Sequence, residues 1–206
     1  EAYADCFAER DLRVGQILVT QEDTEDRRRY LNARATLTRL LDWGTIPLVN
    51  ENDTVATAEI RFGDNDRLAA RVGGMVGADL LVLLSDIDGL YTANPKTDPG
   101  AEHLPLITSG ITPTVEAMAG VENSAYSNGG MVTKLAAAKI ALGAGCAMLI
   151  ADGRGLYPLK ALRDGTKASL FKPTVSQHSA RQAWLVGALS GNGVLVLDEG
   201  AATAVN

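Results

Sequence analysis

The residues best suited to chemistry lie in one glycine-rich stretch, residues 127–134, which reads Ser-Asn-Gly-Gly-Met-Val-Thr-Lys. Two adjacent glycines, Gly129 and Gly130, let the backbone approach a ligand closely, and the helix predicted to follow them offers free N–H groups to an anion. Lys134 lies in the first turn of that helix, where cations are usually disfavoured, and a bound phosphate would reconcile the two. A plain glycine turn before a helix, with a solvated lysine, explains the same residues equally well.

Short polar side chains gather at three other places. Residues 50–54 (Asn-Glu-Asn-Asp-Thr) directly follow an apolar run, residues 63–66 (Gly-Asp-Asn-Asp) open a helical pattern, and Asp86 follows the most apolar run of the chain. Amide and carboxylate groups in such positions can bind a small polar ligand, an ammonium group or Mg²⁺-bound water. Taken singly, each place is also explained by an Asx-rich turn or a helix cap.

Together these features are typical of phosphoryl transfer, in which positioning and charge neutralisation supply most of the catalysis. The spacing of residues 127–134 fits neither a Walker loop nor a Rossmann fingerprint. A Ser-His-Asp hydrolase has little support, because His103 and His178 are isolated and are expected to be ordinary surface or loop residues. No metal site is predicted, and Cys6 and Cys146 are expected to be free thiols in a reducing cytoplasm.

Alternating strands and helices must position these residues. Apolar runs that predict buried strands cover 16–20, 46–50, 80–84 and 147–150. Helical patterns cover 1–10, 23–43, 66–74, 115–119 and 132–142, with Asp23 or Thr24 expected to cap the second helix and Gly44 to end it. The alternation favours an α/β fold, a three-layer sandwich with a mainly parallel central sheet. Ligands collect at the carboxyl ends of such strands, where the polar clusters fall.

Composition narrows the class of protein. The 206 residues are 46% hydrophobic and 21% charged, as expected of a globular chain with a packed core. The net charge of −6 argues against nucleic acid as a partner, because phosphate-binding proteins are usually basic. No run is long enough to cross a membrane, and no signal peptide is visible. The chain begins without Met inside a helical pattern and ends without a helix stop, so we expect an internal fragment.

Four motifs, in this order along the chain, resemble those of the amino acid kinase family. They are Asn-Glu-Asn-Asp-Thr-Val at 50–55, Gly-Asp-Asn-Asp-Arg-Leu at 63–68, Ser-Asp-Ile-Asp-Gly-Leu-Tyr at 85–91 and Gly-Gly-Met-Val-Thr-Lys at 129–134. The last two are shared widely in that family, whereas the first two resemble its members that act on glutamate. The resemblance covers residues 1–172, and residues 173–206 resemble a linker and the beginning of a small β-rich PUA-like domain.

The resemblance implies phosphorylation of the side-chain carboxylate of L-glutamate by ATP and Mg²⁺, the first step of proline synthesis. It also implies a cytoplasmic homo-oligomer, dimer or tetramer, and feedback inhibition by proline. The glutamate-binding residues that it implies are Asn50, Asp53 and Asn65. The ATP-binding residues that it implies are Ser85, Asp86, Asn128, Gly129, Gly130, Met131, Val132, Thr133 and Lys134. For catalysis, Lys134 would neutralise charge on the transferring phosphoryl group and Asp66 would orient lysines near the phosphates.

The sequence departs from the family pattern in one respect. The family's domain begins with a strand that carries a glycine-rich turn and a second phosphate-binding lysine, followed by a Ser-Gly loop, and this chain contains neither. We therefore expect the 206-residue chain alone to lack a central strand and to be inactive or nearly so.

Three alternatives stay open. The first is another member of the family, such as an acetylglutamate, aspartate or nucleoside monophosphate kinase. The second is a module that senses an amino acid or a nucleotide without chemistry, which would tolerate the missing lysine. The third is an RNA-binding protein, based on the PUA-like tail, which the acidic charge disfavours.

Overall fold

A computed structural model describes residues 2–52, 64–119, 130–177 and 179. The helices are α1 Ala2–Ala8, α2 Gln21–Glu25, α3 Arg27–Asp42, α4 Asp64–Val76, α5 Pro113–Met118, α6 Met131–Gly143 and α7 Pro158–Arg163. The strands are β1 Arg13–Val19, β2 Thr45–Glu51, β3 Leu80–Ser85, β4 Leu90–Tyr91, β5 His103–Leu104, β6 Leu106–Ile107, β7 Ala147–Asp152 and β8 Ala168–Phe171. The α/β class is confirmed, and the four strands predicted at 16–20, 46–50, 80–84 and 147–150 are present.

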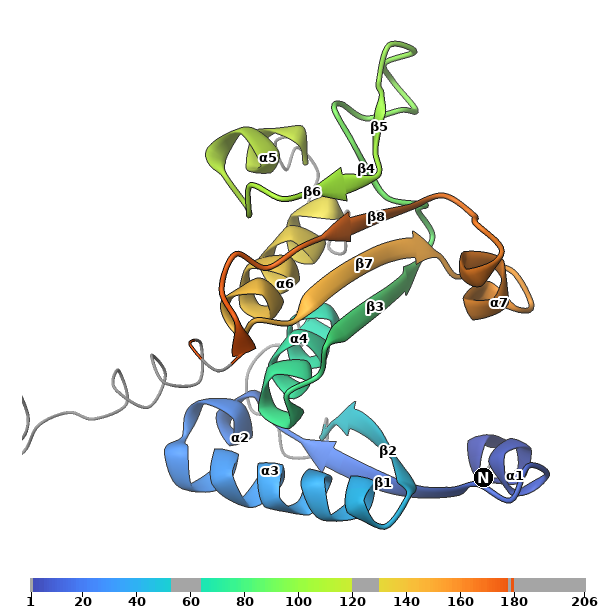
Figure 1. The fold of residues 1–206 in the computed structure, drawn as a ribbon, viewed down its shortest axis with the longest axis vertical. Helices are drawn as coiled ribbons and strands as arrows, with labels where there is room; N and C mark the ends of the chain where they lie inside the picture. Colours follow the sequence, from blue (N-terminus) through green and yellow to red (C-terminus); the bar gives the residue numbers. More distant parts are fainter. Residues whose placement is uncertain (1, 53–63, 120–129, 178, 180–206) are drawn as a thin grey trace, which may run out of the picture.

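The strands form a four-stranded sheet in the order β3-β7-β8-β6 and two smaller sheets, β1-β2 and β4-β5 (Figure 1). β3 and β7 are parallel, as are β1 with β2 and β6 with β8, so the prediction of a mainly parallel arrangement is confirmed. β8 runs antiparallel to β7. Parallel pairing of β3 with β7 places Ser85 opposite Asp152, so the carboxyl ends of both strands lie at the same edge of the sheet.

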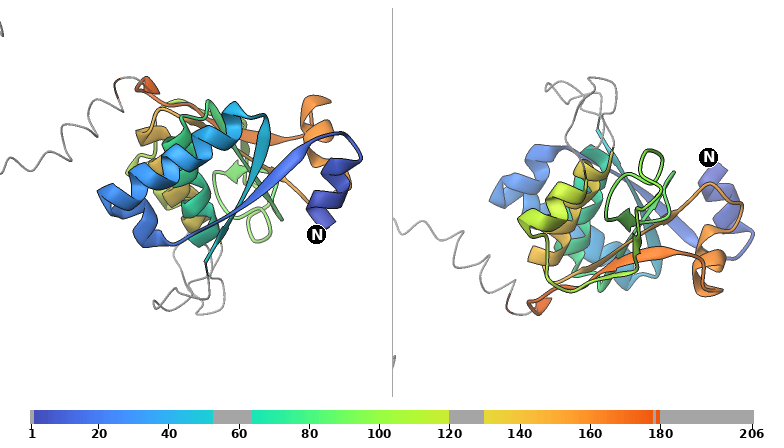
Figure 2. Two further views of the ribbon diagram at one scale, coloured as in Figure 1. Left: turned by 90° about the horizontal axis from the view of Figure 1, so that it is seen from below. Right: turned by 90° about the horizontal axis from the view of Figure 1, so that it is seen from above.

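Helices α4 and α6 lie side by side against the four-stranded sheet (Figures 1 and 2). Asp66, near the start of α4, contacts Lys134 near the start of α6, and Gly74 near the end of α4 contacts Ala144 just beyond the end of α6. The two helices are therefore parallel, and both begin at the same corner of the molecule. Their small facing residues and the inner faces of the strands form one core cluster, whose fully buried members include Ala70, Ala137, Ala138, Ala141, Met148, Ile150 and Phe171.

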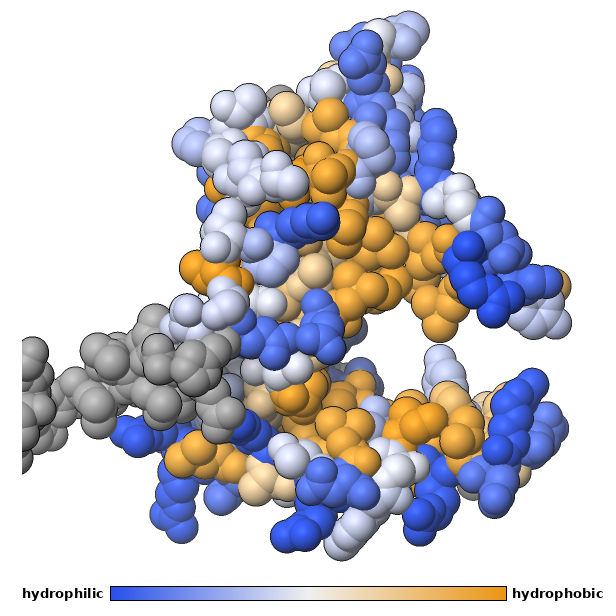
Figure 3. Space-filling view, in the orientation of Figure 1, coloured by the Kyte–Doolittle hydropathy of each residue, from blue (hydrophilic) through white to orange (hydrophobic). Residues whose placement is uncertain are grey.

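The opposite face of β3 is open. Leu80 and Leu84 are 48% and 44% exposed, while Leu83, which points to the other face, is buried. The prediction that residues 80–84 form a buried strand is thus wrong for one face, because no helix among the described residues covers that face. Figure 3 shows the resulting band of apolar surface along the sheet, above a hollow that separates it from the β1-β2 part.

The β1-β2 pair packs against α3, where the Leu40 side chain lies beside Gly15 of β1, and Val19 of β1 and Leu37 of α3 are buried. The single helix predicted over 23–43 is instead two helices, because the backbone of Asp26 is extended and ends α2. Thr20, rather than Asp23 or Thr24, caps α2, and the Asp26 side chain caps α3 by accepting a hydrogen bond from the Arg29 N–H. Gly44, with φ +65°, follows α3 as expected.

One side chain ties this part to α4. Arg71 donates hydrogen bonds of 2.7 Å to the Thr24 hydroxyl and to the Glu25 carboxylate of α2. Most of residues 173–206, including the expected PUA-like start, lies outside the described residues, so that domain division stays a prediction. In the part of the chain that the structure describes, no helix has the length and apolar character needed to cross a membrane.

Candidate functional site

The joint start of α4 and α6 is the corner at which the predicted phosphate-binding lysine lies. The Lys134 ammonium is 3.2 Å from the Asp66 carboxylate, and the two side chains are only 8% and 23% exposed. The sequence hypotheses for these two residues, made from motifs 68 positions apart, converge here in one ion pair. A buried ammonium group needs a close anionic partner, and the Asp66 carboxylate supplies one to Lys134.

Within the described residues, no side chain caps the first N–H groups of α6. Gly130 is the N-cap, with an extended backbone (φ −70°, ψ −169°), and it makes no side-chain capping hydrogen bond. Thr133 donates to the Gly130 carbonyl over 2.9 Å, and its hydroxyl lies 3.4 Å from the Asp66 carboxylate. Met131 and Thr133 are partly buried, and Val132 is exposed. Asn128 and Gly129 lie outside the described residues.

This corner favours an anion. The aligned peptide dipoles of two parallel helices put two positive ends in one place. The Lys134 ammonium lies beside them, with its charge balanced by the Asp66 carboxylate. The arrangement is not that of an ordinary glycine turn with a solvated lysine, since Lys134 is buried.

A second polar group lies at the carboxyl ends of β3 and β7. Ser85 donates to the Asp86 carboxylate over 3.0 Å, and its carbonyl accepts the Gly153 N–H at 2.7 Å. Arg154 forms a two-point ion pair with Asp152, with distances of 2.9 and 2.6 Å. Hydrogen bonds from its guanidinium and backbone lower the pKa of Asp152 to about 2.

An open pocket of about 420 Å³ adjoins this second group. It lies between the end of β7 and α7, and its lining includes Asp152, Tyr157, Lys160 and Thr166. A volume of this order suits a small-molecule ligand. Among the described residues, no group of three or more His, Cys, Asp or Glu side chains is placed to hold a metal ion.

The predicted glutamate-binding residues are only partly described. Asn50 is an exposed residue of β2, in the separate two-stranded sheet, and Asn65 is an exposed residue in the first turn of α4, next to Asp66. Asp53 lies outside the described residues. The structure therefore brings Asn65 to the Lys134 corner, while no described contact joins Asn50 to it.

Sequence reasoning missed two residues near these groups and one contact. Arg154 lies in the polar stretch 151–155 after a strand, which predicts a site at that strand end but not the ion pair of Arg154 with Asp152. Ser169 and His103 carried no signal in the sequence, and the expectation that His103 is an ordinary surface or loop residue is wrong. His103 is a partly buried residue of β5 whose ring packs edge-on against Tyr91, with ring centres 5.1 Å apart.

Comparison with known proteins bears directly on this corner. The profile of the amino acid kinase family matches residues 1–152, which include the Asp66–Lys134 pair and, at the second polar group, Ser85, Asp86 and Asp152. The chain belongs to that family. The fold agrees: the structure superposes on that of UMP kinase from Ureaplasma parvum with a TM-score of 0.55, at 11% identity, over 83% of this chain and 65% of that chain.

Curated relatives within the family are more similar. The chain is 55% identical, over 99% of its length, to glutamate 5-kinase of Paramagnetospirillum magneticum, and 58% identical, over 100%, to glutamate 5-kinase of Brucella anthropi. It spans 55% and 54% of these proteins, about half the length of the curated relatives that it matches.

Proposed function

We propose that the chain carries the phosphoryl-binding part of a glutamate 5-kinase, which transfers the γ-phosphoryl group of ATP to the side-chain carboxylate of L-glutamate. Relatives that bear this name are 55% to 58% identical to it over almost its whole length. The observation that carries the proposal is the buried Lys134–Asp66 pair at the shared start of α4 and α6. A lysine held at an anion-favouring corner is what the transfer of a phosphoryl group needs.

In this proposal, a carboxylate oxygen of glutamate forms a bond to the γ-phosphorus as the bond from phosphorus to the bridging oxygen breaks. ADP leaves with that electron pair, and the product is L-glutamyl 5-phosphate. The attacking carboxylate is already ionised at pH 7, so no general base is required. Lys134 neutralises charge on the transferring group, Asp66 fixes the ammonium, and the extended Gly130 allows the phosphate to reach the N–H groups of α6.

The remaining site residues enter the proposal by position. Ser85 and Asp86 hold the nucleotide at the end of β3, together with residues 128–134, and Asn50, Asp53 and Asn65 bind glutamate. Mg²⁺ enters with ATP as part of the substrate. The proposal extends to a cytoplasmic homo-oligomer, dimer or tetramer, inhibited by proline, with a kinase domain over residues 1–172 and the start of a PUA-like domain over 173–206.

The test is an acyl-phosphate assay. The chain, completed to the length of its relatives, is given ATP, Mg²⁺ and hydroxylamine, and hydroxamate is compared for L-glutamate, N-acetylglutamate and aspartate. We expect product with L-glutamate, and a loss of at least about 100-fold in kcat for Lys134→Ala. Lys139→Ala is the matched control, because Lys139 also lies on α6 but pairs with Glu116 at the surface.

The other outcomes of the assay are equally informative. Product from another acid alone would keep the phosphoryl chemistry and overturn the substrate. No product from any acid, with ATP still bound, would overturn the kinase in favour of a sensor. The same assay on the 206-residue chain alone tests the expectation that it is inactive.

A further inference from the structure

The hydroxyl of Ser169 joins three elements inside the core. Ser169 lies on β8 and has no exposed surface. Its oxygen accepts a hydrogen bond of 2.7 Å from the Leu90 N–H of β4 and donates one of 2.6 Å to the Leu104 carbonyl of β5. The Nε2 atom of His103 lies 3.3 Å away. Since the single hydroxyl hydrogen goes to Leu104, the network assigns a proton to Nε2, which donates to Ser169.

Gly89 is fitted to this hydroxyl. Its φ is +147°, a conformation that residues with a side chain rarely adopt. A Cβ at this position would lie 2.4 Å from the Ser169 oxygen and 2.6 Å from His103 Nε2. The hydroxyl and the imidazole therefore occupy the space of the missing side chain, and the backbone at residue 89 rests directly on them.

These contacts fix the segment that follows β3 at both of its ends. At its start, the Ser85 carbonyl is bound to the Gly153 N–H beyond β7. At its end, Gly89 and Leu90 are held by Ser169. Between them, the Asp88 carboxylate accepts a hydrogen bond from the Tyr91 hydroxyl at 3.0 Å. Residues 86–89 thus lie between two anchored points, and Asp86 is the first residue of this segment.

We propose that Ser169 is a positioning residue of the nucleotide site: by holding Gly89 and Leu90, its hydroxyl fixes the path of residues 86–89 and so the placement of Ser85 and Asp86. The inference rests on the proposed function, which assigns Ser85 and Asp86 to ATP. Ser169 itself is buried beneath the segment and has no exposed surface with which to contact a ligand. Its removal should weaken the binding of ATP and leave that of glutamate unchanged, because the described residues proposed for glutamate, Asn50 and Asn65, lie on β2 and α4 and share no described contact with β8.

Ser169→Ala in the full chain tests this role, with KM for ATP, KM for L-glutamate, kcat and the thermal midpoint measured together. We expect KM for ATP to rise about tenfold and KM for glutamate to stay within about twofold, since one lost buried hydrogen-bonding group is worth about that factor. Ser169→Thr, which keeps the hydroxyl, should recover part of the lost affinity for ATP. Ser109→Ala is the control, because the Ser109 hydroxyl is exposed and bonds only locally.

The outcomes separate cleanly. An unchanged KM for ATP in folded Ser169→Ala, or an equal rise in both KM values, overturns the positioning role. If that variant does not fold, His103→Ala removes one contact of the hydroxyl, and it has to raise KM for ATP selectively by about threefold. A wild-type chain without glutamate-dependent activity overturns the proposed function instead. If the wild type is active and Ser169→Ala leaves KM for ATP unchanged, only the role of Ser169 is overturned.

Discussion

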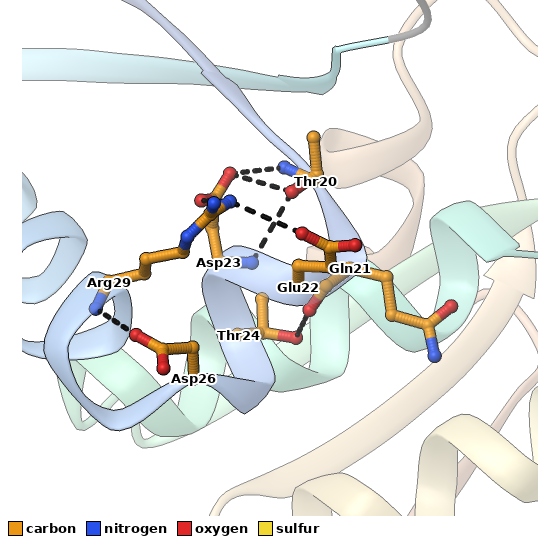
Figure 4. A network of polar contacts seen from close by, with 7 residues as sticks. All are labelled: Thr20, Gln21, Glu22, Asp23, Thr24, Asp26 and Arg29. Carbon is orange, nitrogen blue, oxygen red and sulfur yellow. Dashed lines mark hydrogen bonds and ion pairs between the residues drawn. The ribbon is translucent and has the colours of Figure 1, made fainter. Parts of the chain in front are cut away.

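Two regions of the molecule hold charged side chains at the starts of two helices: the corner where α4 and α6 begin and the segment where α2 and α3 begin. At the corner, Asp66 and Lys134 are 68 positions apart in sequence, and both are largely buried. At the start of α2 and α3, Thr20, Asp23, Asp26 and Arg29 form a network within ten positions, at the surface (Figure 4). The Arg29 and Asp23 side chains are 55% and 27% exposed and 3.4 Å apart.

The difference shows where a charged pair can carry function. The α2–α3 network satisfies N–H groups at two helix starts and is screened by water, so each of its ion pairs contributes little. The Asp66–Lys134 pair is shielded from water, so its charges act strongly on one another and on any ligand beside them. Removing one partner of such a pair is costly, because the other charge stays in a poorly solvated place.

The largest expected effect is on the buried pair. Asp66→Ala should lower the free energy of unfolding by about 2 kcal/mol, less than the value for a fully buried pair because Asp66 is 23% exposed. Glu116→Ala is the matched control: Glu116 also lies in the first turn of a helix and pairs with a lysine of α6, Lys139, but both side chains are about half exposed. Its cost should stay below about 1 kcal/mol. Denaturant unfolding measures both, and equal costs would remove the distinction between the corner and a surface pair.

The next effect concerns the contact that brings the two helices together. An added Cβ at Gly74 would lie 2.8 Å from the Ala144 Cβ, so Gly74→Ala must separate α4 from α6. We expect a loss of about 1 kcal/mol, because overpacking outweighs the gain in helix propensity. At the neighbouring Gly73 the nearest atom would be the Cys146 sulfur at 3.9 Å, an ordinary contact. Gly73→Ala should therefore be neutral or stabilising, and a comparable loss in both variants would refute the packing explanation.

Sequence patterns predicted the elements that depend on local signals. Apolar runs predicted the strands at 80–84 and 147–150, and Gly130 indicated the start of the helix that carries Lys134. All three elements are confirmed. The split at Asp26 was missed, because the helical pattern continues through it and only the extended backbone shows the break. The open face of β3 was also missed: a run of five apolar residues indicates burial on both faces, whatever lies beside the strand.

The candidate site likewise contains residues that sequence patterns predicted and residues that they missed. Lys134 and Asp66 were each predicted from a motif, and the structure adds the fact that they meet in a buried pair. Ser169 could not be found, because nothing near it in the sequence relates it to Leu90, 79 positions away. Its role arises only when β8 packs beside β7 and passes under the segment after β3. Long-range pairing of this kind leaves no local pattern to read.

The smallest expected effects are at the α2–α3 start. The Thr20 hydroxyl caps α2 by accepting the Asp23 N–H, while the Asp23 carboxylate bonds back to Thr20 over 2.7 and 2.9 Å. Thr20→Ala should cost about 1 kcal/mol in the free energy of unfolding. Thr36→Ala, in the exposed middle of α3, is the control and should be neutral or slightly stabilising. If both variants unfold alike, the cap contributes nothing measurable.

The pH dependence of the same cap gives a sharper comparison with the corner. Burial opposes ionisation of Asp23, but hydrogen bonds from Thr20 and the charge of Arg29 outweigh it, so its pKa in the folded chain is below the ordinary value of 3.8. A lowered folded-state pKa means that ionised Asp23 adds stability above about pH 4, and that this stability is lost as the pH falls through the folded-state value. The difference in unfolding free energy between wild type and Asp23→Asn should therefore be constant from about pH 7 to 5 and shrink below about pH 4. A difference that stays constant down to about pH 3 would show that Asp23 acts through its shape and hydrogen bonds and not through its charge.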